Sequence, residues 1–158
     1  MTSLLNRLIA KAARHLYLRR HQKAWGEEPQ LAVSVSNLCV ELEGRQVRLR
    51  MYHGQSDKPM VIYAHGGGFV IGSLETHDRF CRALSVKSGC SLVSIDYRLA
   101  PEYTFPAAHD DCLEATEWVI ENLENLAPNN GLFILAGDSA GGNIAIASTL
   151  ALQHRHGI

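Results

Sequence analysis

The sequence lacks several features that mark special classes of protein. Its four cysteines include no CxxC pair, and their spacing suggests neither a zinc site nor a disulfide framework. No apolar run is long enough to cross a membrane, and charges interrupt the apolar residues at the start, unlike a secretory signal. A formal net charge of −1 gives no field that would favour nucleic acid. We therefore expect a cytoplasmic protein with no metal, no nucleic-acid partner, and buried or half-buried free thiols.

Acidic residues are missing from the first 26 positions, which carry basic residues instead. Apolar residues recur there at helical spacing, at Leu4, Leu5, Leu8, Ile9, Ala12 and Leu16. Such an amphipathic helix could pack on the domain, lie on a membrane surface, or act as a mitochondrial transit peptide. We favour packing, because periodicity of this kind most often reflects burial against a core.

The rest of the chain has the composition of one globular domain, with 46% hydrophobic and 20% charged residues in a total of 158. After a polar break at 26–30, two short runs at 38–42 and 47–52 flank the turn Glu43-Gly44. The second run alternates apolar and polar residues, as a half-buried strand does. We expect the two runs to pair as an antiparallel hairpin.

Three later runs are apolar without alternation, at 60–64, 90–95 and 132–136. Strands of this kind are buried on both faces, as in a parallel sheet. Helical stretches separate them, and the expected ranges are 77–88 with Thr76 as N-cap and Gly89 at its end, 106–126, and from after Ser139 to 156. The alternation predicts an α/β fold with a mixed, mostly parallel sheet and helices on both faces.

The sharpest motif is G-x-S-x-G, from Gly137 through Asp138, Ser139 and Ala140 to Gly141. It follows a predicted buried strand and opens a helix, which is the context of a nucleophile elbow. Small neighbours permit the tight turn that exposes the serine hydroxyl at the helix N-terminus. The motif predicts Ser139 as a nucleophile, with the backbone N–H of Ala140 facing a developing oxyanion.

A second motif, His65-Gly66-Gly67-Gly68, follows the strand at 60–64. Consecutive glycines leave bare backbone N–H groups, as an oxyanion hole requires. We assign Gly67 and Gly68 as donors, together with Ala140. The phosphate-loop fingerprint G-x-x-x-x-G-K fails here, because no lysine follows Gly72. The dinucleotide fingerprint G-x-G-x-x-G also fails, because Ile71 stands where its last glycine belongs.

Together these motifs resemble the hormone-sensitive-lipase-like family of α/β-hydrolase carboxylesterases. The resemblance rests on HGGGF at 65–69, DYRLAPE at 96–102 and GDSAGGN at 137–143, and 65–79 is similar to bacterial acetyl esterases. It implies the α/β-hydrolase fold, and hydrolysis of a small ester with short acyl chains through an acyl-enzyme, without a cofactor. It also implies a cap built partly from N-terminal helices, which favours packing of the first helix.

Other polar residues receive structural interpretations. We expect Arg98 and Glu102 to form an ion pair and His65 to order the glycine loop by hydrogen bonding. His77 and His109, at predicted helix starts, are interpreted as surface or cap-facing side chains. His154 and His156 have no carboxylate or cysteine nearby in the sequence, so a metal site there is not expected.

The triad is incomplete in this sequence. In the α/β-hydrolase fold the acid and the histidine follow the serine, but the 19 residues after Ser139 contain no Asp or Glu. His154 would lie roughly 20 Å away along its own helix. We therefore expect residues 31–158 to be the N-terminal part of a catalytic domain, with a cap segment at 1–30. The triad Asp and His would lie outside this chain, which we expect to be inactive alone. It could form a homo-oligomer or pair with a missing C-terminal part. The alternative is a catalytically dead fold that binds a small ligand.

Overall fold

The computed structural model describes residues 3–24, 31–55, 57–127 and 131–157. Five strands form one sheet in the order β1-β2-β4-β3-β5. Their bounds are β1 Val35–Leu42, β2 Arg45–Tyr52, β3 Met60–Ala64, β4 Leu92–Asp96 and β5 Phe133–Gly137. β1, β2 and β4 pair antiparallel, whereas β3 pairs parallel with both β4 and β5. The expected mixed sheet and its leading hairpin are confirmed.

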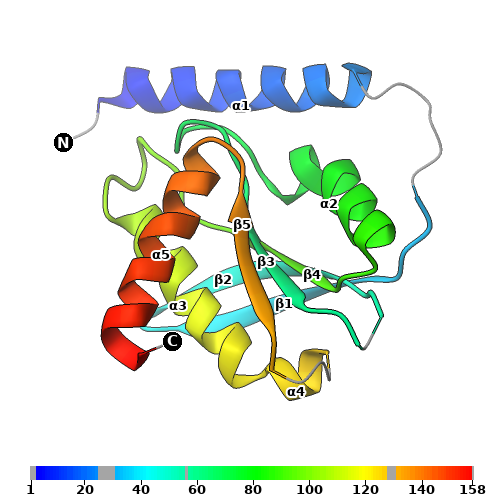
Figure 1. The fold of residues 1–158 in the computed structure, drawn as a ribbon. Coiled ribbons are helices and arrows are strands. Elements are labelled where there is room, and N and C mark those ends of the chain that lie inside the picture. The colour runs from blue at the N-terminus through cyan, green and yellow to red at the C-terminus, as the bar shows by residue number, and fades with distance from the viewer. Residues whose placement is uncertain (1–2, 25–30, 56, 128–130, 158) are drawn as a thin grey trace.

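Helices cover both faces of this sheet (Figure 1). They are α1 Leu4–Ala24, α2 Leu74–Ser88, α3 Ala107–Glu121, α4 Leu123–Leu126 and α5 Ala140–His156. Met60, Ile62 and Ala64 of β3 belong to the larger core, which α3 and α5 cover. Val61 and Tyr63, with the opposite orientation, pack beside α2 in a second core. This alternation explains why β3 is apolar along its whole length.

Several predicted boundaries were wrong. α2 begins at Leu74, not 77, because the Ser73 hydroxyl accepts the Thr76 N–H and the Thr76 hydroxyl accepts the Ser73 N–H. Thr76 is therefore the partner in a capping box and not the N-cap. The predicted helix at 106–126 is divided at Asn122 into α3 and α4.

Cys39 is exposed, whereas the other three cysteines are buried free thiols, as expected.

β5 differs from the expected strand buried on both faces. It lies at the edge of the sheet, with β3 as its one neighbour among the described residues. Ile134 is 48% exposed, and Ile146 and Leu150 of α5 are also exposed. An apolar strand at an open edge presents unpaired backbone groups together with apolar side chains.

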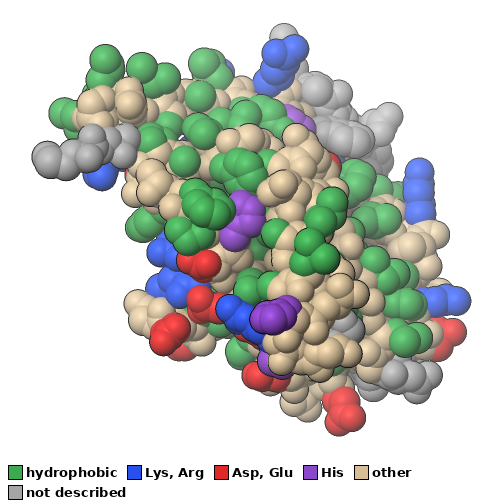
Figure 2. Space-filling view, turned by 60° about the vertical axis from the view of Figure 1, so that its left-hand side comes forward, with side chains coloured by type: hydrophobic (Ala, Val, Ile, Leu, Met, Phe, Trp, Pro, Cys, Tyr) green, Lys and Arg blue, Asp and Glu red, His purple; other side chains and the backbone are tan. Residues whose placement is uncertain are grey.

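α1 packs across the molecule, but not through the predicted face. Leu4, Leu5, Leu8, Ile9 and Leu16 are 55–75% exposed. The face toward the domain instead carries the buried Ala10 and the half-buried Arg14 and Tyr17. Figure 2 shows hydrophobic side chains along the upper rim of the molecule, where α1 lies. No described helix is long and apolar enough to span a bilayer.

Candidate active site

Ser139 lies on a sharp turn between β5 and α5. Its backbone has φ 50° and ψ −115°, a combination that side-chain-bearing residues rarely adopt. Strain of this kind often occurs at functional sites, where the surrounding structure maintains it. The side chain of Ser139 is exposed and makes no capping hydrogen bond to α5. The hydroxyl is therefore available to react.

The turn fits against the end of β3 only because Gly141 has no side chain. A Cβ at Gly141 would lie 1.9 Å from the carbonyl oxygen of Ala64. Ala64 is also the residue that pairs with Gly137 at the end of β5. The glycines of the G-x-S-x-G motif thus allow the serine turn to meet the loop that follows β3.

That loop contains Gly67 and Gly68, the predicted oxyanion donors. The carbonyl oxygen of Gly67 accepts the N–H groups of Val70 and Ile71, at 3.1 and 2.9 Å, which closes a tight turn. Within the described part of the chain, the N–H groups of Gly67 and Gly68 donate no hydrogen bond. Ala140 is the first residue of α5, where N–H groups lack acceptors inside the helix. Figure 1 shows this loop and the serine turn together under α1.

Asp138 joins the serine turn to the glycine loop. Its Oδ1 atom accepts the Gly66 N–H at 2.7 Å and the Tyr63 hydroxyl at 2.6 Å, and His77 Nε2 lies 3.5 Å away. Partial burial opposes ionisation, but contacts with His77, Tyr63 and Gly66 hold the pKa of the Asp138 carboxyl well below its usual range. The sequence identified Asp138 as part of a motif but contained no signal for these partners.

We expect Asp138→Asn to destabilise the protein by about 1 kcal/mol at pH 7, because hydrogen bonds to a charged acceptor are stronger than those to a neutral one. A carboxyl with a lowered folded pKa stabilises the fold above its unfolded pKa of about 3.9, and this contribution is lost as pH falls toward the folded pKa. The difference from wild type should therefore shrink between pH 7 and pH 3 in urea unfolding.

Asp57→Asn is the matched control, because the Asp57 side chain is 75% exposed and its nearest cation, Lys58 Nζ, is 3.9 Å away. This control should lower the free energy of unfolding little at either pH. A difference between wild type and Asp138→Asn that does not change with pH would contradict the assigned role of the charge.

His65 and His77 belong to a stack of rings behind the glycine loop. The His65 ring stacks on Tyr97 at 4.2 Å and on His77 at 5.3 Å between centroids. Its Nδ1 lies 2.9 Å from the Gly66 carbonyl oxygen, and the Tyr97 hydroxyl donates to the His65 carbonyl at 2.6 Å. Burial lowers the pKa of His65, which favours the neutral ring. Of the two alternatives for His77, the surface position is wrong, because His77 is only 6% exposed, and its ring instead lies 6.0 Å from that of His21 on α1.

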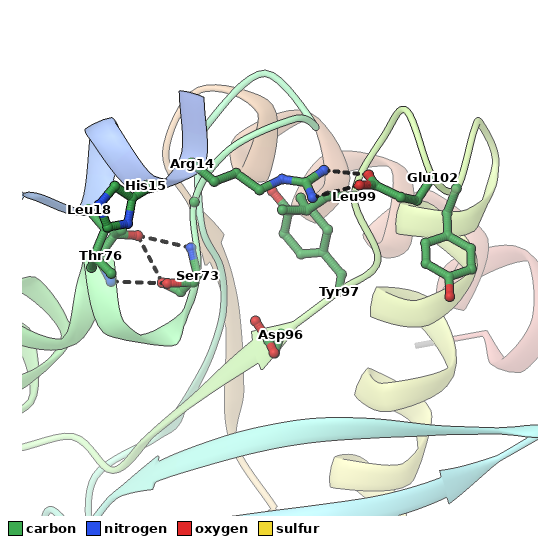
Figure 3. Close-up of a pocket in the computed structure, with 11 residues that line it drawn as sticks. Arg14, His15, Leu18, Ser73, Thr76, Asp96, Tyr97, Leu99 and Glu102 are labelled. Carbon is green, nitrogen blue, oxygen red and sulfur yellow. Dashed lines mark hydrogen bonds and ion pairs between the residues drawn. The ribbon is translucent and has the colours of Figure 1, made fainter. Parts of the chain in front are cut away.

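The pairing of Arg98 with Glu102 was also wrong. Glu102 binds Arg14 of α1 through both carboxylate oxygens, at 3.1 and 2.7 Å, and Arg98 binds Asp111. Arg14 also donates to the carbonyl oxygens of Val70 and Ala100, both at 2.7 Å. One guanidinium therefore holds α1 to the glycine loop and to the segment after β4. A cavity of about 430 Å³ lies beneath α1 at this contact (Figure 3).

No described residue supplies a base for Ser139. No described histidine or carboxylate forms a hydrogen bond with it, and His156 at the far end of α5 binds Glu117 at 3.0 Å. His109 Nε2 lies 3.1 Å from Asn143 Oδ1. The described ranges also contain no group of three or more His, Cys, Asp or Glu side chains that could hold a metal ion.

Comparison with known proteins identifies the same fold and relatives that are named as esterases. A family model described as the α/β-hydrolase fold matches residues 61–158. The chain is 50% identical to the esterase LipI of Mycobacterium tuberculosis over 91 residues, which are 58% of this chain and 28% of that protein. It is 38% identical to an ethyl acetate hydrolase of Pseudomonas putida over 118 residues, which are 70% of this chain and 37% of that protein.

Solved structures agree over almost the whole chain. An esterase of Pyrobaculum calidifontis superimposes with a TM-score of 0.84 at 40% identity, covering 92% of this chain and 48% of that one. The esterase LipW of Mycobacterium marinum gives 0.81 at 34% identity, covering 92% and 48%. The chain thus spans about half the length of these structures. With its serine turn and glycine loop, it belongs to the α/β-hydrolase-fold family, as its resemblance to hormone-sensitive-lipase-like carboxylesterases indicates.

Proposed function

We propose that the protein containing this chain is a serine carboxylesterase that hydrolyses short-chain acyl esters through an acyl-enzyme on Ser139. The observation that carries this proposal is that the serine hydroxyl is exposed and makes no capping hydrogen bond. It is exposed on a strained turn at a helix N-terminus, it caps nothing, and unpaired backbone N–H groups lie on the neighbouring loop. A protein that merely binds a ligand needs neither the strain nor the unpaired donors.

In the proposed reaction the Ser139 oxygen attacks the ester carbonyl carbon, and its proton passes to a general base. The N–H groups of Gly67, Gly68 and Ala140 stabilise the negative charge that develops on the carbonyl oxygen. The alcohol then leaves with a proton from the base, and water releases the acid from the acyl-serine. We propose that the base and its carboxylate partner lie outside these 158 residues, because no described histidine or carboxylate forms a hydrogen bond with Ser139 and the 19 residues that follow it contain no Asp or Glu.

A small ester substrate is supported by the relative named ethyl acetate hydrolase and by the motif similarity to acetyl esterases. We also propose that residues 1–30 form a cap segment over the catalytic domain at 31–158. The hydrogen bonds from Arg14 to Val70 and Ala100 support this division, because they hold α1 against the glycine loop, which carries two of the proposed donors, and against the segment after β4.

A panel of 4-nitrophenyl esters tests the proposal. The intact protein should hydrolyse the acetate and butyrate with higher kcat/KM than the decanoate, and a fluorophosphonate should label Ser139 covalently. Residues 1–158 expressed alone should show no comparable activity, because Ser139 lacks a base there. Loss of a triad member costs about 10⁴–10⁶ in rate in a serine protease.

Two results would overturn this assignment. Esterase activity of residues 1–158 equal to that of the intact protein would show that the base lies within this chain. An intact protein that turns over no ester and leaves Ser139 unlabelled, yet binds small esters, would favour the ligand-binding alternative.

A further inference from the structure

A second cavity, of about 310 Å³, lies beside the glycine loop and is lined by aromatic side chains. Gly68 forms part of its wall, so it adjoins one of the proposed oxyanion donors. The rings of Phe69, Phe105 and His109 supply other parts of the wall, together with Tyr103. Its volume is at the lower end of the range for small-molecule sites, enough for one ring and its linker.

Phe69 lines this cavity from a backbone conformation that disfavours a side chain. Its φ is 63°, and apart from Ser139 it is the one described residue other than glycine with a positive φ. A residue of this kind in the left-handed region costs about 1–2 kcal/mol. The carbonyl oxygen of Phe69 accepts the Ala100 N–H at 2.8 Å, which helps to hold this conformation. The fold thus maintains a strained residue whose ring borders the cavity, directly after the proposed donors.

The His109 ring is fixed on three sides. It stacks on Phe69 with centroids 5.5 Å apart and 28° between the planes, and Phe105 meets it edge-on at 5.3 Å and 71°. His109 Nε2 lies 3.1 Å from Asn143 Oδ1. Asn143 belongs to the first turn of α5, and its N–H donates to the Ser139 carbonyl oxygen at 3.2 Å. The three rings are therefore oriented with respect to one another and to the helix that begins at the nucleophile.

We propose that this cavity selects esters that carry a planar aromatic ring, and that Phe69, Phe105 and His109 determine this specificity. The inference rests on the proposed esterase function and adds its substrate class. Stacked and edge-on contacts favour an aromatic ring over a saturated ring of similar size, because only the aromatic ring has the complementary charge distribution. Phe105 is 82% exposed, and a substrate ring in the cavity would cover it.

The test compares esters that differ only in aromaticity. Benzyl acetate and cyclohexylmethyl acetate have alcohols of similar leaving ability, and ethyl phenylacetate and ethyl cyclohexylacetate place the ring on the acyl side. We expect kcat/KM of the intact protein to favour the aromatic member by roughly 3- to 10-fold in at least one pair. In Phe105→Leu the ratio for that pair should fall to within about twofold of unity.

Phe80→Leu is the matched control, because Phe80 is also partly exposed but lies on α2 and does not line the cavity. The control should keep the wild-type ratio. Ethyl acetate hydrolysis with no aromatic preference in either pair would overturn the inference and leave the esterase proposal intact. If both Phe105→Leu and His109→Leu kept the preference for the aromatic ester, these rings would not determine the specificity. Failure to hydrolyse any of these esters would overturn both proposals.

Discussion

Replacing Ser139 with alanine is expected to lower kcat for 4-nitrophenyl acetate by a factor of about 10⁶, the scale measured when a serine protease loses its nucleophile. The substitution removes the hydroxyl that would form the acyl-enzyme and leaves only the oxyanion donors and substrate binding. Since the Ser139 side chain caps nothing, its loss should not weaken α5. The unfolding midpoint in urea should therefore remain within the range of an ordinary surface substitution.

Ser88→Ala provides a comparison at a residue remote from the serine turn, near the end of α2. The Ser88 hydroxyl donates to the Leu84 carbonyl at 2.6 Å and accepts the Cys90 N–H at 3.1 Å, so its removal affects contacts at the end of α2 and not the serine turn. This variant should retain wild-type kcat. If Ser139→Ala also retained wild-type turnover, with homogeneous protein and no contaminating esterase, the nucleophile would have to be a different residue.

A side chain at Gly67 is expected to reduce kcat by roughly a hundredfold or more, which is the cost of losing one oxyanion donor. A Cβ at Gly67 would lie 2.0 Å from the Ile71 carbonyl oxygen, and the residue has φ 129°, where side chains are strained. Gly67→Ala must therefore shift the turn at Gly67 and move the N–H groups of the loop. Steady-state kinetics should show the loss mainly in kcat, with KM changed little.

Gly68→Ala separates this steric effect from backbone strain. A Cβ at Gly68 meets no atom within 4 Å, although its φ of 59° still disfavours a side chain by about 1–2 kcal/mol. We expect a smaller loss of kcat than for Gly67→Ala. Equal kcat values for Gly67→Ala and wild type would show that this loop does not contribute to the transition state.

The sequence was most informative where a backbone requirement restricts residue choice. Glycines around Ser139 and at 66–68 predicted a tight turn and a loop of bare backbone N–H groups, and the structure contains both, at the ends of neighbouring parallel strands. Runs without alternation correctly predicted β3 and β4 as interior strands. The same reasoning did not predict the exposure of β5, because an apolar run indicates the environment that a strand is suited to, and no described strand pairs with the outer edge of β5.

Side-chain pairing across distant segments could not be read from the sequence. Arg14 and Glu102 are 88 positions apart, and nothing in either segment indicates that they meet. The contacts of Asp138 with Tyr63 and His77 likewise depend on how β3, β5 and α2 lie next to one another in the fold. The orientation of α1 was mispredicted for a related reason. Its most apolar stripe faces outward, whereas polar hydrogen bonds of Arg14 determine which side meets the domain.

The strand order also has a consequence for how the protein folds during synthesis. β3 lies between β4 and β5, both of which follow it in the chain, and Met60 pairs with Phe133, about 70 positions later. The hairpin of β1 and β2 can form early from local contacts, but β3 gains its first neighbour only when β4 has been synthesised. Pairs so far apart in sequence must overcome a large loop-closure entropy and tend to form slowly. The glycine loop and the serine turn are therefore brought together only when β5 pairs with β3, which is the last pairing among the five described strands to become possible during synthesis.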